Sequence, residues 1–358
     1  MRIYLNDFPL YMHRDFRRCG LSIKNDVNKP QLAIILIAVC IYGIMIGLFF
    51  WTISEYNRAI PIDSSSFPDP VLREYVRNRA DLNGSGRLND DERDYLEEIV
   101  LPGKEVESLE GIGLFPNLKI LECKNNNLKT LDLSKNSRIE KVDVSLNKLE
   151  SINLSGCDHL LELYVDENVL KSIDIRGCFS LQHLSCASNN LEDLDISSQK
   201  LLELDCSRNL LSELDMRSQK TLQVLKCDDN WIESLDLQSP CLKHLDCSYN
   251  RLSRLSNLGE ELTFLDCSNN MLTSLDLSRC TQLSHMAIEF NFFDSVDLSS
   301  CYETISDLEY AAICGSFNQD TKMLEGLVRN TQPRGKEKVR YICIMRKDRL
   351  IRDYSIKG

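Results

Sequence analysis

The chain has 358 residues, 43% of them hydrophobic, and a formal net charge of −12. Residues 1–30 hold six Lys or Arg against three Asp, and residues 322–358 hold eleven against four acids, so residues 31–321 carry −22. This acidity repels a phosphate backbone and argues against nucleic acid as the main partner. The basic C-terminal segment allows a weaker contact with anionic polymers or lipid headgroups.

The first predicted element is an apolar run without charge, Leu32–Ile53. At about 1.5 Å per residue it is long enough to cross a hydrocarbon core of about 30 Å. Basic residues precede the run and acidic residues follow it, which predicts that residues 1–31 form a short cytoplasmic tail. No small-x-small cleavage site is evident, so we expect an uncleaved transmembrane signal anchor. This predicts a single-pass type II protein of the cell membrane, with everything after the span on the extracellular side.

Residues 54–67 contain Pro61 and three consecutive Ser and are expected to be a linker. Residues 68–101 then show two stretches of helical spacing around the segment Asp81–Glu92, which matches a twelve-residue EF-hand calcium loop. Its expected ligands are Asp81, Asn83, Ser85, the carbonyl of Arg87, Asn89 through a water, and Glu92. Gly86 occupies the position of the sharp turn, and Leu88 occupies the usual apolar position.

Calcium is the only cofactor that the sequence suggests, and its binding is expected to be weak. Only Asp81 and Glu92 are charged among the direct ligands, which predicts a dissociation constant on the order of 10⁻⁴–10⁻³ M. The alternative is a turn that keeps the shape of the loop without a metal. In either case the small helical module would shield the open end of the core that follows.

From Pro116 to Cys301 one pattern is repeated nine times, Leu-x-x-Leu-x-Cys-x-x-Asn-x-Leu-x-x-Leu-Asp-Leu-Ser. A period of 20 or 21 residues is the signature of a leucine-rich solenoid, in which each unit buries its apolar face only against its neighbours. The apolar spacing is not helical, which excludes a run of amphipathic helices. The recurring Asn marks the chain leaving a short strand, at Asn126, Asn147, Asn168, Asn189, Asn209, Asn230, Asn250, Asn270 and Asn291.

The chemistry of each repeat predicts its structure. In Leu265-Asp266-Cys267 the outer two side chains point inward and the middle one outward, because strand side chains alternate. A buried Asn amide can satisfy backbone groups of the following turn, and stacked copies would form a ladder. The Asp of each Leu-Asp-Leu-Ser is a repeat feature, most simply a turn or ladder residue.

The phrases LDCSNNMLTSLDLS and LDCSYNRL resemble those of leucine-rich repeat surface proteins of Gram-positive gut bacteria, which are internalin-like in style. The resemblance covers roughly residues 66–301, and related proteins place an EF-hand-like cap before their repeats. It implies an α/β-type repeat solenoid, a leucine-rich repeat horseshoe with a parallel concave sheet. Residues 102–301 would form this solenoid, beginning with a degenerate coil. The resemblance constrains the function only loosely, because such solenoids serve many unrelated binding functions.

The pattern stops after Cys301, and residues 302–358 are expected to cap the far end. Residues 302–330 suggest a short helix with Leu324, Leu327 and Val328 on one face. Two alternating segments, residues 339–345 and 350–356, then predict a β-hairpin.

The 15 cysteines are expected to be mainly free and buried. Six of them, Cys123, Cys186, Cys206, Cys227, Cys247 and Cys267, share one inward strand position, where Cys acts as a small hydrophobe. Stacked neighbours have parallel Cβ vectors, a poor geometry for disulfides. Isolated bridges such as Cys280–Cys301 or Cys314–Cys343 stay open as an alternative. Free thiols outside a membrane suit an anaerobe, and they also suit a cytosolic protein.

The outward positions of the concave sheet are where a ligand is expected to bind. Repeats seven to nine gather aromatic, imidazole and acidic side chains there, as binding hot spots often do. The candidate residues are His244, Asp246, Tyr249, Phe264, Asp266, His285 and Phe290. The alternative is a scatter of aromatics on a long surface. A metal shared by His244 and His285 is not expected, because they lie two coils apart, about 10 Å.

No catalytic fingerprint occurs in the sequence, so an enzyme is not expected. The sequence favours a membrane-anchored extracellular leucine-rich repeat protein that binds a protein or glycan on its concave face. One alternative is a structural or regulatory membrane protein whose repeats assemble with partners on the cytoplasmic side. Another is a calcium-responsive sensor gated by the loop. Neither the ligand nor the oligomeric state follows from the sequence.

Overall fold

The structure is a computed structural model that describes residues 29–197 and 199–301, together with five short strands beyond them. The chain divides into two compact units, residues 1–59 and 60–358. Each unit is described by itself.

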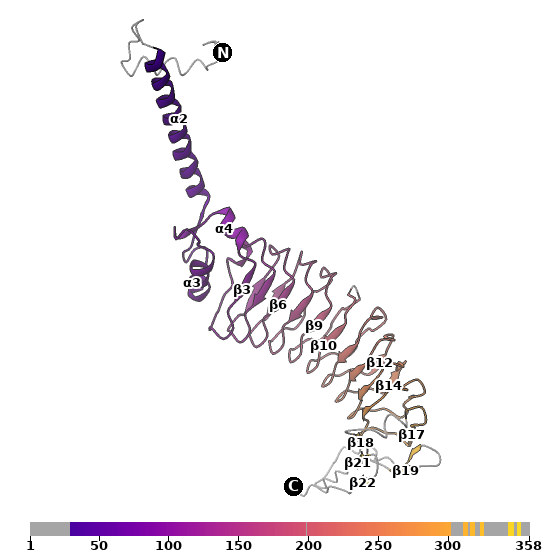
Figure 1. The fold of residues 1–358 in the computed structure, drawn as a ribbon. Helices are drawn as coiled ribbons and strands as arrows, with labels where there is room; N and C mark the ends of the chain where they lie inside the picture. The colour runs from indigo at the N-terminus through magenta and orange to yellow at the C-terminus, as the bar shows by residue number, and fades with distance from the viewer. Residues whose placement is uncertain are drawn as a thin grey trace. The chain divides into compact units, whose positions relative to one another are not determined.

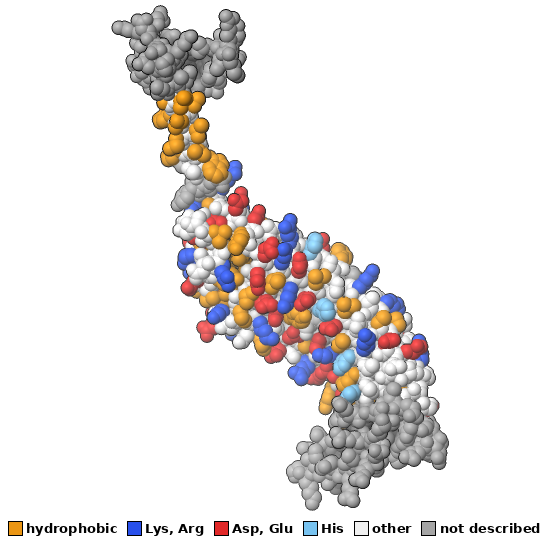
Figure 2. All heavy atoms as spheres, in the orientation of Figure 1, with side chains coloured by type: hydrophobic (Ala, Val, Ile, Leu, Met, Phe, Trp, Pro, Cys, Tyr) orange, Lys and Arg blue, Asp and Glu red, His pale blue; other side chains and the backbone are white. Residues whose placement is uncertain are grey.

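The described part of the first unit is helix α2 (Lys29–Arg58), which includes the apolar run Leu32–Ile53. Its side chains are described from Ile37 to Thr52, and all of these are exposed, including Phe49 and Trp51 (Figure 2). Within the residues whose side chains are described, no helix is both long and apolar enough to cross a membrane.

The second unit begins with a small helical cap. Strand β1 (Ile60–Pro61) pairs antiparallel with β2 (Arg87–Leu88), which lies between helices α3 (Pro70–Arg79) and α4 (Asp90–Tyr95). Residues 60–67 therefore differ from the expected linker, since β1 is paired and Ile62 and Phe67 are buried. The second helix is also shorter than its apolar spacing suggested. It ends at Tyr95, because Ile99 and Val100 lie on the first strand of the solenoid.

The solenoid is built around a 13-stranded sheet that runs along one side (Figure 1). Its parallel strands follow each other in chain order, one per coil, and pair in register, with Leu245 opposite Leu225 and Leu265. These strands are β3 (Glu98–Val100), β4 (Ile120–Glu122), β6 (Lys141–Asp143), β8 (Glu162–Tyr164), β9 (His183–Ser185), β10 (Glu203–Asp205), β11 (Val224–Lys226), β13 (His244–Asp246), β15 (Phe264–Asp266) and β16 (His285–Ala287). The predicted parallel-sheet solenoid is confirmed, and the sheet begins at Glu98, a few residues earlier than the expected boundary.

The pivot asparagines form the predicted ladder. The Nδ2 of Asn250 donates to the carbonyl of Cys227 on the preceding coil at 2.8 Å and to that of Cys247 on its own coil at 3.2 Å. Its Oδ1 accepts from the backbone N–H of Ile232 at 2.9 Å. Each amide thus satisfies buried backbone groups of two coils, which would otherwise destabilise the turn.

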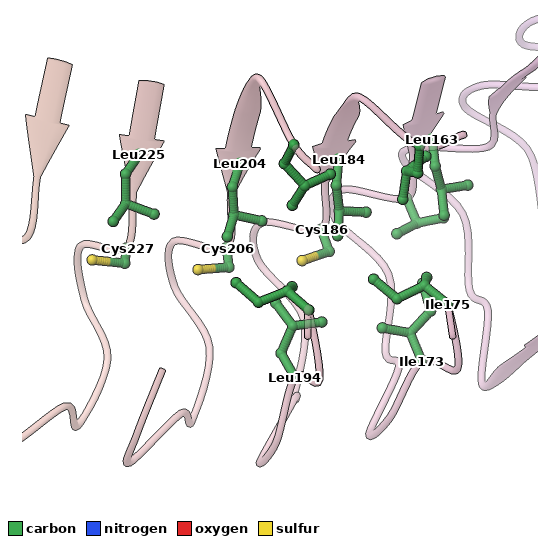
Figure 3. Packing of buried hydrophobic residues seen from close by; sticks show 14 of the residues in the cluster. Leu163, Ile173, Ile175, Leu184, Cys186, Leu194, Leu204, Cys206, Leu225 and Cys227 are labelled. Carbon is green, nitrogen blue, oxygen red and sulfur yellow. The ribbon is translucent and has the colours of Figure 1, made fainter. Parts of the chain in front are cut away.

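Columns of leucine and cysteine fill the core. Leu184, Leu204 and Leu225 project inward from the sheet, and Cys186, Cys206 and Cys227 form a second column beneath them (Figure 3). The six ladder cysteines are free and buried, as predicted. Burial raises the pKa of Cys123 to about 12, so its thiol stays protonated. Cys280 is also free, so it forms no bridge with Cys301, whereas the suggested pair Cys314–Cys343 lies outside the residues whose side chains are described.

The cap covers the first coil and shares its core. Phe67 stacks on Phe115 with ring centroids 6.0 Å apart, and both rings are fully buried. Gly111 is required at this junction, because a Cβ there would lie 2.3 Å from the carbonyl oxygen of Ser66. Asp69 caps α3 through Oδ1, and its Oδ2 accepts from the backbone N–H of Glu107 at 2.8 Å. One buried carboxylate therefore joins the cap to the solenoid.

The return segments of the coils contain shorter sheets. Strand β5 (Thr130–Asp132) pairs with β7 (Ser151–Asn153), and β12 (Ser234–Asp236) pairs with β14 (Arg254–Ser256). A single 3₁₀ turn, η2 (Ile112–Leu114), replaces a strand in the first coil. The Asp of the Leu-Asp-Leu-Ser pattern accepts the N–H two residues later, as Asp276 does from Ser278 at 3.0 Å, so its predicted turn role is confirmed.

Beyond Cys301 the described segments are strands. They are β18 (Ala311–Ile313), β19 (Ser316–Asn318), β20 (Met323–Glu325), β21 (Cys343–Arg346) and β22 (Arg349–Ile351), and the last strand before Cys301 is β17 (Ser295–Asp297). Leu324 pairs with Val296 and Phe317 in a three-stranded sheet, so the helix expected around it is not present in these segments. Strand β18 extends the long sheet, and β21 and β22 form an antiparallel hairpin beside it.

Candidate functional site

The outward side of strands β3–β16, called the sheet face below, carries two side chains per strand. Because neighbouring strands pair in register, equivalent positions of successive coils lie side by side, about 4.8 Å apart. The first outward position of the last four strands holds Val224, His244, Phe264 and His285. The sheet face therefore consists of columns, each with one residue per coil.

Three rings stack in the first column. His244 lies parallel to Phe264, with centroids 4.0 Å apart and an interplanar angle of 9°. Phe264 also stacks on His285, at 5.9 Å and 26°. Burial lowers the pKa of His244, which favours the neutral imidazole in this stack. The structure therefore brings together three of the predicted site residues in a continuous, half-exposed aromatic surface, called the ring stack below.

Asp246 and Asp266 occupy the next column and are partly used by the fold. The Oδ1 of Asp266 accepts from the backbone N–H of Ser268 at 2.9 Å and from its hydroxyl at 2.7 Å. Asp246 makes the same bonds with Ser248. These bonds hold the chain as it leaves the strand, so each carboxylate has a structural role besides any ligand contact. Burial raises the pKa of Asp266, and the neighbouring Asp246 raises it further, against the bonds from Ser268.

Tyr249 and Phe290 lie apart from the ring stack. Both have left-handed backbone, with φ of 51° and 57°, at the position just before the pivot Asn. Tyr249 follows His244 by five residues, which places it up to about 16 Å farther along the coil. Asn269 occupies the same position on the coil between them, so the two rings are not on adjacent coils. The predicted patch is therefore two separate groups.

Two acidic residues that the sequence analysis missed lie in the turns that follow β11 and β16. Asp228 and Glu289 occupy a position where most coils carry Ser or another small residue, and both are half-buried. Burial raises the pKa of Asp228 to about 6, helped by Asp246 and Asp205. Burial also raises the pKa of Glu289 to about 7, helped by Asp266. Their departure from the repeat pattern was the signal that could have identified them.

A second group of exposed apolar side chains follows the pivot asparagines. Trp231, Met271 and Phe292 each lie one residue after the Asn and are 48%, 50% and 37% exposed. The guanidinium of Arg251, at the same position of the coil between Trp231 and Met271, lies 5.0 Å from the Trp231 ring. This stripe was also missed, because single exposed hydrophobics are common in sequences and only the stacking aligns them.

The loop Asp81–Glu92 has the shape of a cation-binding loop. Asp81 accepts from the N–H groups of Ser85 at 2.9 Å and Gly86 at 2.9 Å. The buried Glu92 accepts from Asn83 at 3.1 Å and Asn89 at 3.0 Å. Gly84 and Gly86 have positive φ, which lets the chain curl.

The donor set of the loop suits a hard cation only weakly. Asp81 and Glu92 supply carboxylates, Asn83 an amide oxygen, Ser85 a hydroxyl and Arg87 a carbonyl, whereas the Asn89 side chain caps α4 by accepting from Glu92 N–H. In the described part of the chain, no three His, Cys, Asp or Glu side chains gather as metal ligands. The loop Asp81–Glu92 offers only two carboxylates, so the absence of such a three-residue group does not decide whether the loop binds calcium.

Comparison with known proteins supports the fold. No protein-family model and no curated protein sequence matches the chain. Among solved structures, it is similar to the functional domain of InlJ from Listeria monocytogenes, which includes a cysteine ladder (TM-score 0.56, 28% identity, covering 71% of this chain and 61% of that one). It is also similar to a leucine-rich repeat protein of Leptospira interrogans (TM-score 0.52, 22% identity, covering 61% and 60%).

The chain thus spans about three fifths of each of these two neighbours. They place it in the leucine-rich repeat class of solenoids, and the InlJ domain shares the column of stacked cysteines described above.

Proposed function

We propose that the chain is a non-enzymatic interaction module of a bacterial cell surface, which binds a protein or glycan through its sheet face. The observation that carries the proposal is the ring stack of His244, Phe264 and His285, which is half-exposed on a regular sheet. Half-exposed aromatic rings beside carboxylates are typical of binding hot spots. Similarity to the InlJ domain agrees with a binding role.

We also propose that α2 anchors the chain in the cell membrane with the repeats outside. Every described side chain from Ile37 to Thr52 is exposed on this apolar helix, which favours a lipid environment over water. Basic residues on the N-terminal side of the helix favour their retention in the cytoplasm.

Topology is tested with an epitope tag after Gly358 and protease added to intact cells. Loss of the tag is expected if the repeats are outside. Protection that ends only on lysis would refute the extracellular proposal and favour partners on the cytoplasmic side. A cytosolic reporter protein that survives the treatment is the control for cell integrity.

Calcium binding by Asp81–Glu92 is a separate proposal that rests on the hydrogen bonds within the loop. Added calcium at about 5 mM, above the expected dissociation constant, should raise the melting temperature of the full chain. The variant Asp81→Asn should lose this increase, whereas Asp94→Asn, on the exposed side of α4, should keep it. An unchanged melting temperature for the unmodified protein would sink both the calcium site and the sensor alternative.

A further inference from the structure

We propose that the ring stack and the carboxylates around it bind an extended, lysine- or arginine-rich segment of a partner protein. This inference rests on the proposed binding function and names the chemistry of its ligand. The ring stack, Asp246 and Asp266 lie on the outward sides of β13, β15 and β16 of one continuous sheet, and Asp228 and Glu289 lie in the turns that follow β11 and β16.

Charge is the first argument. Five carboxylates lie on the same coils as the stack or on the two coils before it, and of the cations near them Lys226 pairs with Asp205 at 3.4 Å, while Arg208 lowers the pKa of Asp228. The five are Asp205, Asp228, Asp246, Asp266 and Glu289. Asp246 and Asp266 lie directly opposite each other in register, an arrangement of like charges that destabilises a sheet. The Oε2 of Glu289 is buried and has no hydrogen-bond partner among the described residues. A cation would relieve both features.

The ring stack supplies the complementary part of the site. Phe264 is stacked between His244 and His285, so the three rings present their edges outward, and the aliphatic part of an arginine or lysine can pack against these edges. Phe264 and Asp266 are two residues apart on one strand and therefore project on the same side about 7 Å apart. One arginine side chain can pack its methylene groups against the ring edge and direct its N–H groups to the carboxylate. The regular strand spacing repeats this arrangement on the neighbouring coil.

A neutral glycan fits these observations less well. Rings and carboxylates can bind sugar hydroxyls, but a neutral sugar would not offset the repulsion between Asp246 and Asp266. Binding of a cationic segment should also weaken at acidic pH for two reasons with the same sign. Protonation removes charge from Asp228, Asp266 and Glu289, and it adds charge to His244.

The test uses the full chain in detergent and fluorescence anisotropy with a labelled peptide of alternating Arg and Gly residues. Matched peptides carry Gln or Glu in place of Arg. Saturable binding of the Arg peptide is expected, tighter than that of the Gln peptide by at least about 10-fold, and weakened by raising NaCl from about 50 to about 300 mM. A further loss of about 10-fold is expected on lowering the pH from about 8 to about 5.5.

Variants separate the site from the overall charge of the protein. Phe264→Ala should lower the affinity for the Arg peptide by about 10-fold. Phe264→Leu, which keeps an apolar side chain on the strand, should lower it by about the same factor. Asp266→Asn should weaken it by at least about 3-fold. The matched control is Asp143→Asn on β6. The Asp143 carboxylate makes the same bonds with Ser145, and the substitution removes the same charge, so this variant should leave the affinity for the Arg peptide unchanged. Melting curves verify that each variant is folded.

Three results would overturn this inference. Equal affinity for the Arg and Gln peptides would show that the charge of the ligand does not determine binding. Equal effects of Asp143→Asn and Asp266→Asn on affinity would show that the peptide does not bind at the ring stack. Salt-independent binding of a neutral oligosaccharide that Phe264→Ala abolishes would identify a glycan instead, and the proposed function would still stand. If neither class of probe binds and Phe264→Ala leaves attachment of intact cells to host-like surfaces unchanged, the proposed function fails as well.

Discussion

The two ends of the sheet face share one backbone and differ in how their charges are arranged. On β4–β8, Glu122 and Asp143 are also opposite each other, but Lys141 Nζ bonds Glu122 Oε1 at 2.9 Å and lies opposite Glu162 on the next strand. That hydrogen bond raises the pKa of Lys141. On β13–β16, Asp246 and Asp266 lie side by side, and neither forms an ion pair among the described residues.

This difference indicates that the inward positions of the repeat stabilise the fold, whereas the variable outward positions are available for binding. The inward columns are the same at both ends, since ladder amides and leucines continue through every regular coil. In the outward columns, Lys141 pairs with one of the two neighbouring acids at the first end, whereas neither Asp246 nor Asp266 forms an ion pair among the described residues at the other end. We expect a ligand to bind where a stable scaffold holds like charges close together, as it does at Asp246 and Asp266.

The strongest test of the shared scaffold is to break the ladder in the middle. Asn189 Nδ2 donates to Val165 O at 3.0 Å, and its Oδ1 accepts from Leu170 N–H at 3.0 Å. Asn189→Ala leaves these buried groups unpaired and should lower the free energy of unfolding by about 3 kcal/mol. The neighbouring Asn190→Ala is the control, because that side chain is exposed. Urea titration measures both, and equal losses would contradict the ladder.

A second test concerns the capped end. Asp69→Ala removes the N-cap of α3 and the acceptor for Glu107 and Ser108, all from one buried carboxylate. The expected loss in free energy of unfolding is about 2 kcal/mol, from the cap and the orphaned donors together. Asp69→Asn should recover part of it, since an amide oxygen can still accept. A loss no larger than that of the exposed Asp94→Ala would show that the cap and the first coil are not joined there.

The third test measures how the stability contributed by buried acidic groups near β11 and β16 depends on pH. Glu289 has a folded-state pKa of about 7 against 4.5 in the unfolded chain, so its ionised form opposes folding. Its stabilising contribution is complete below pH 4.5 and is lost as the pH rises through 7. Glu289→Gln should therefore be more stable than the unmodified protein at pH 8 by about 1 kcal/mol, after allowing for solvent screening, and equal to it near pH 4. Asp228→Asn should follow the same pattern with its midpoint near pH 6. A gain that is constant with pH would refute the electrostatic cause.

The smallest expected effect is at the opposite end. Lys141→Met breaks the pair with Glu122, but both side chains are more than a third exposed, at 35% and 38%. The loss should be about 0.5 kcal/mol or less, and smaller still at high salt. A loss in the free energy of unfolding larger than that of Asp69→Ala would contradict the assignment of this pair as a weak, exposed ion pair.

Sequence alone predicted the parts that follow from periodicity. The strands, the ladder amides and the buried free cysteines were all expected, because one spacing repeated nine times leaves few alternatives. The strand β3 and the packed segment 60–67 were missed, since neither carries the repeat or an apolar period of its own.

The candidate site was predicted only in part for a geometric reason. His244, Phe264 and His285 share a repeat position, so the sequence could align them. Tyr249 and Phe290 were grouped with them because they are near in sequence, although distance along a coil separates them. Asp228 and Glu289 were overlooked because raised pKa values depend on burial, which no spacing rule supplies.

The asparagine ladder has a consequence for how such a protein can change in length. Each amide makes the same bonds to the coil before it, so any regular coil can follow any other without new contacts. Removal of one unit from the middle would let the flanking coils join through an unaltered rung. The number of coils between the cap and the ring stack then acts as a ruler, in steps of about 4.8 Å, that can be lengthened or shortened while the binding surface itself stays the same.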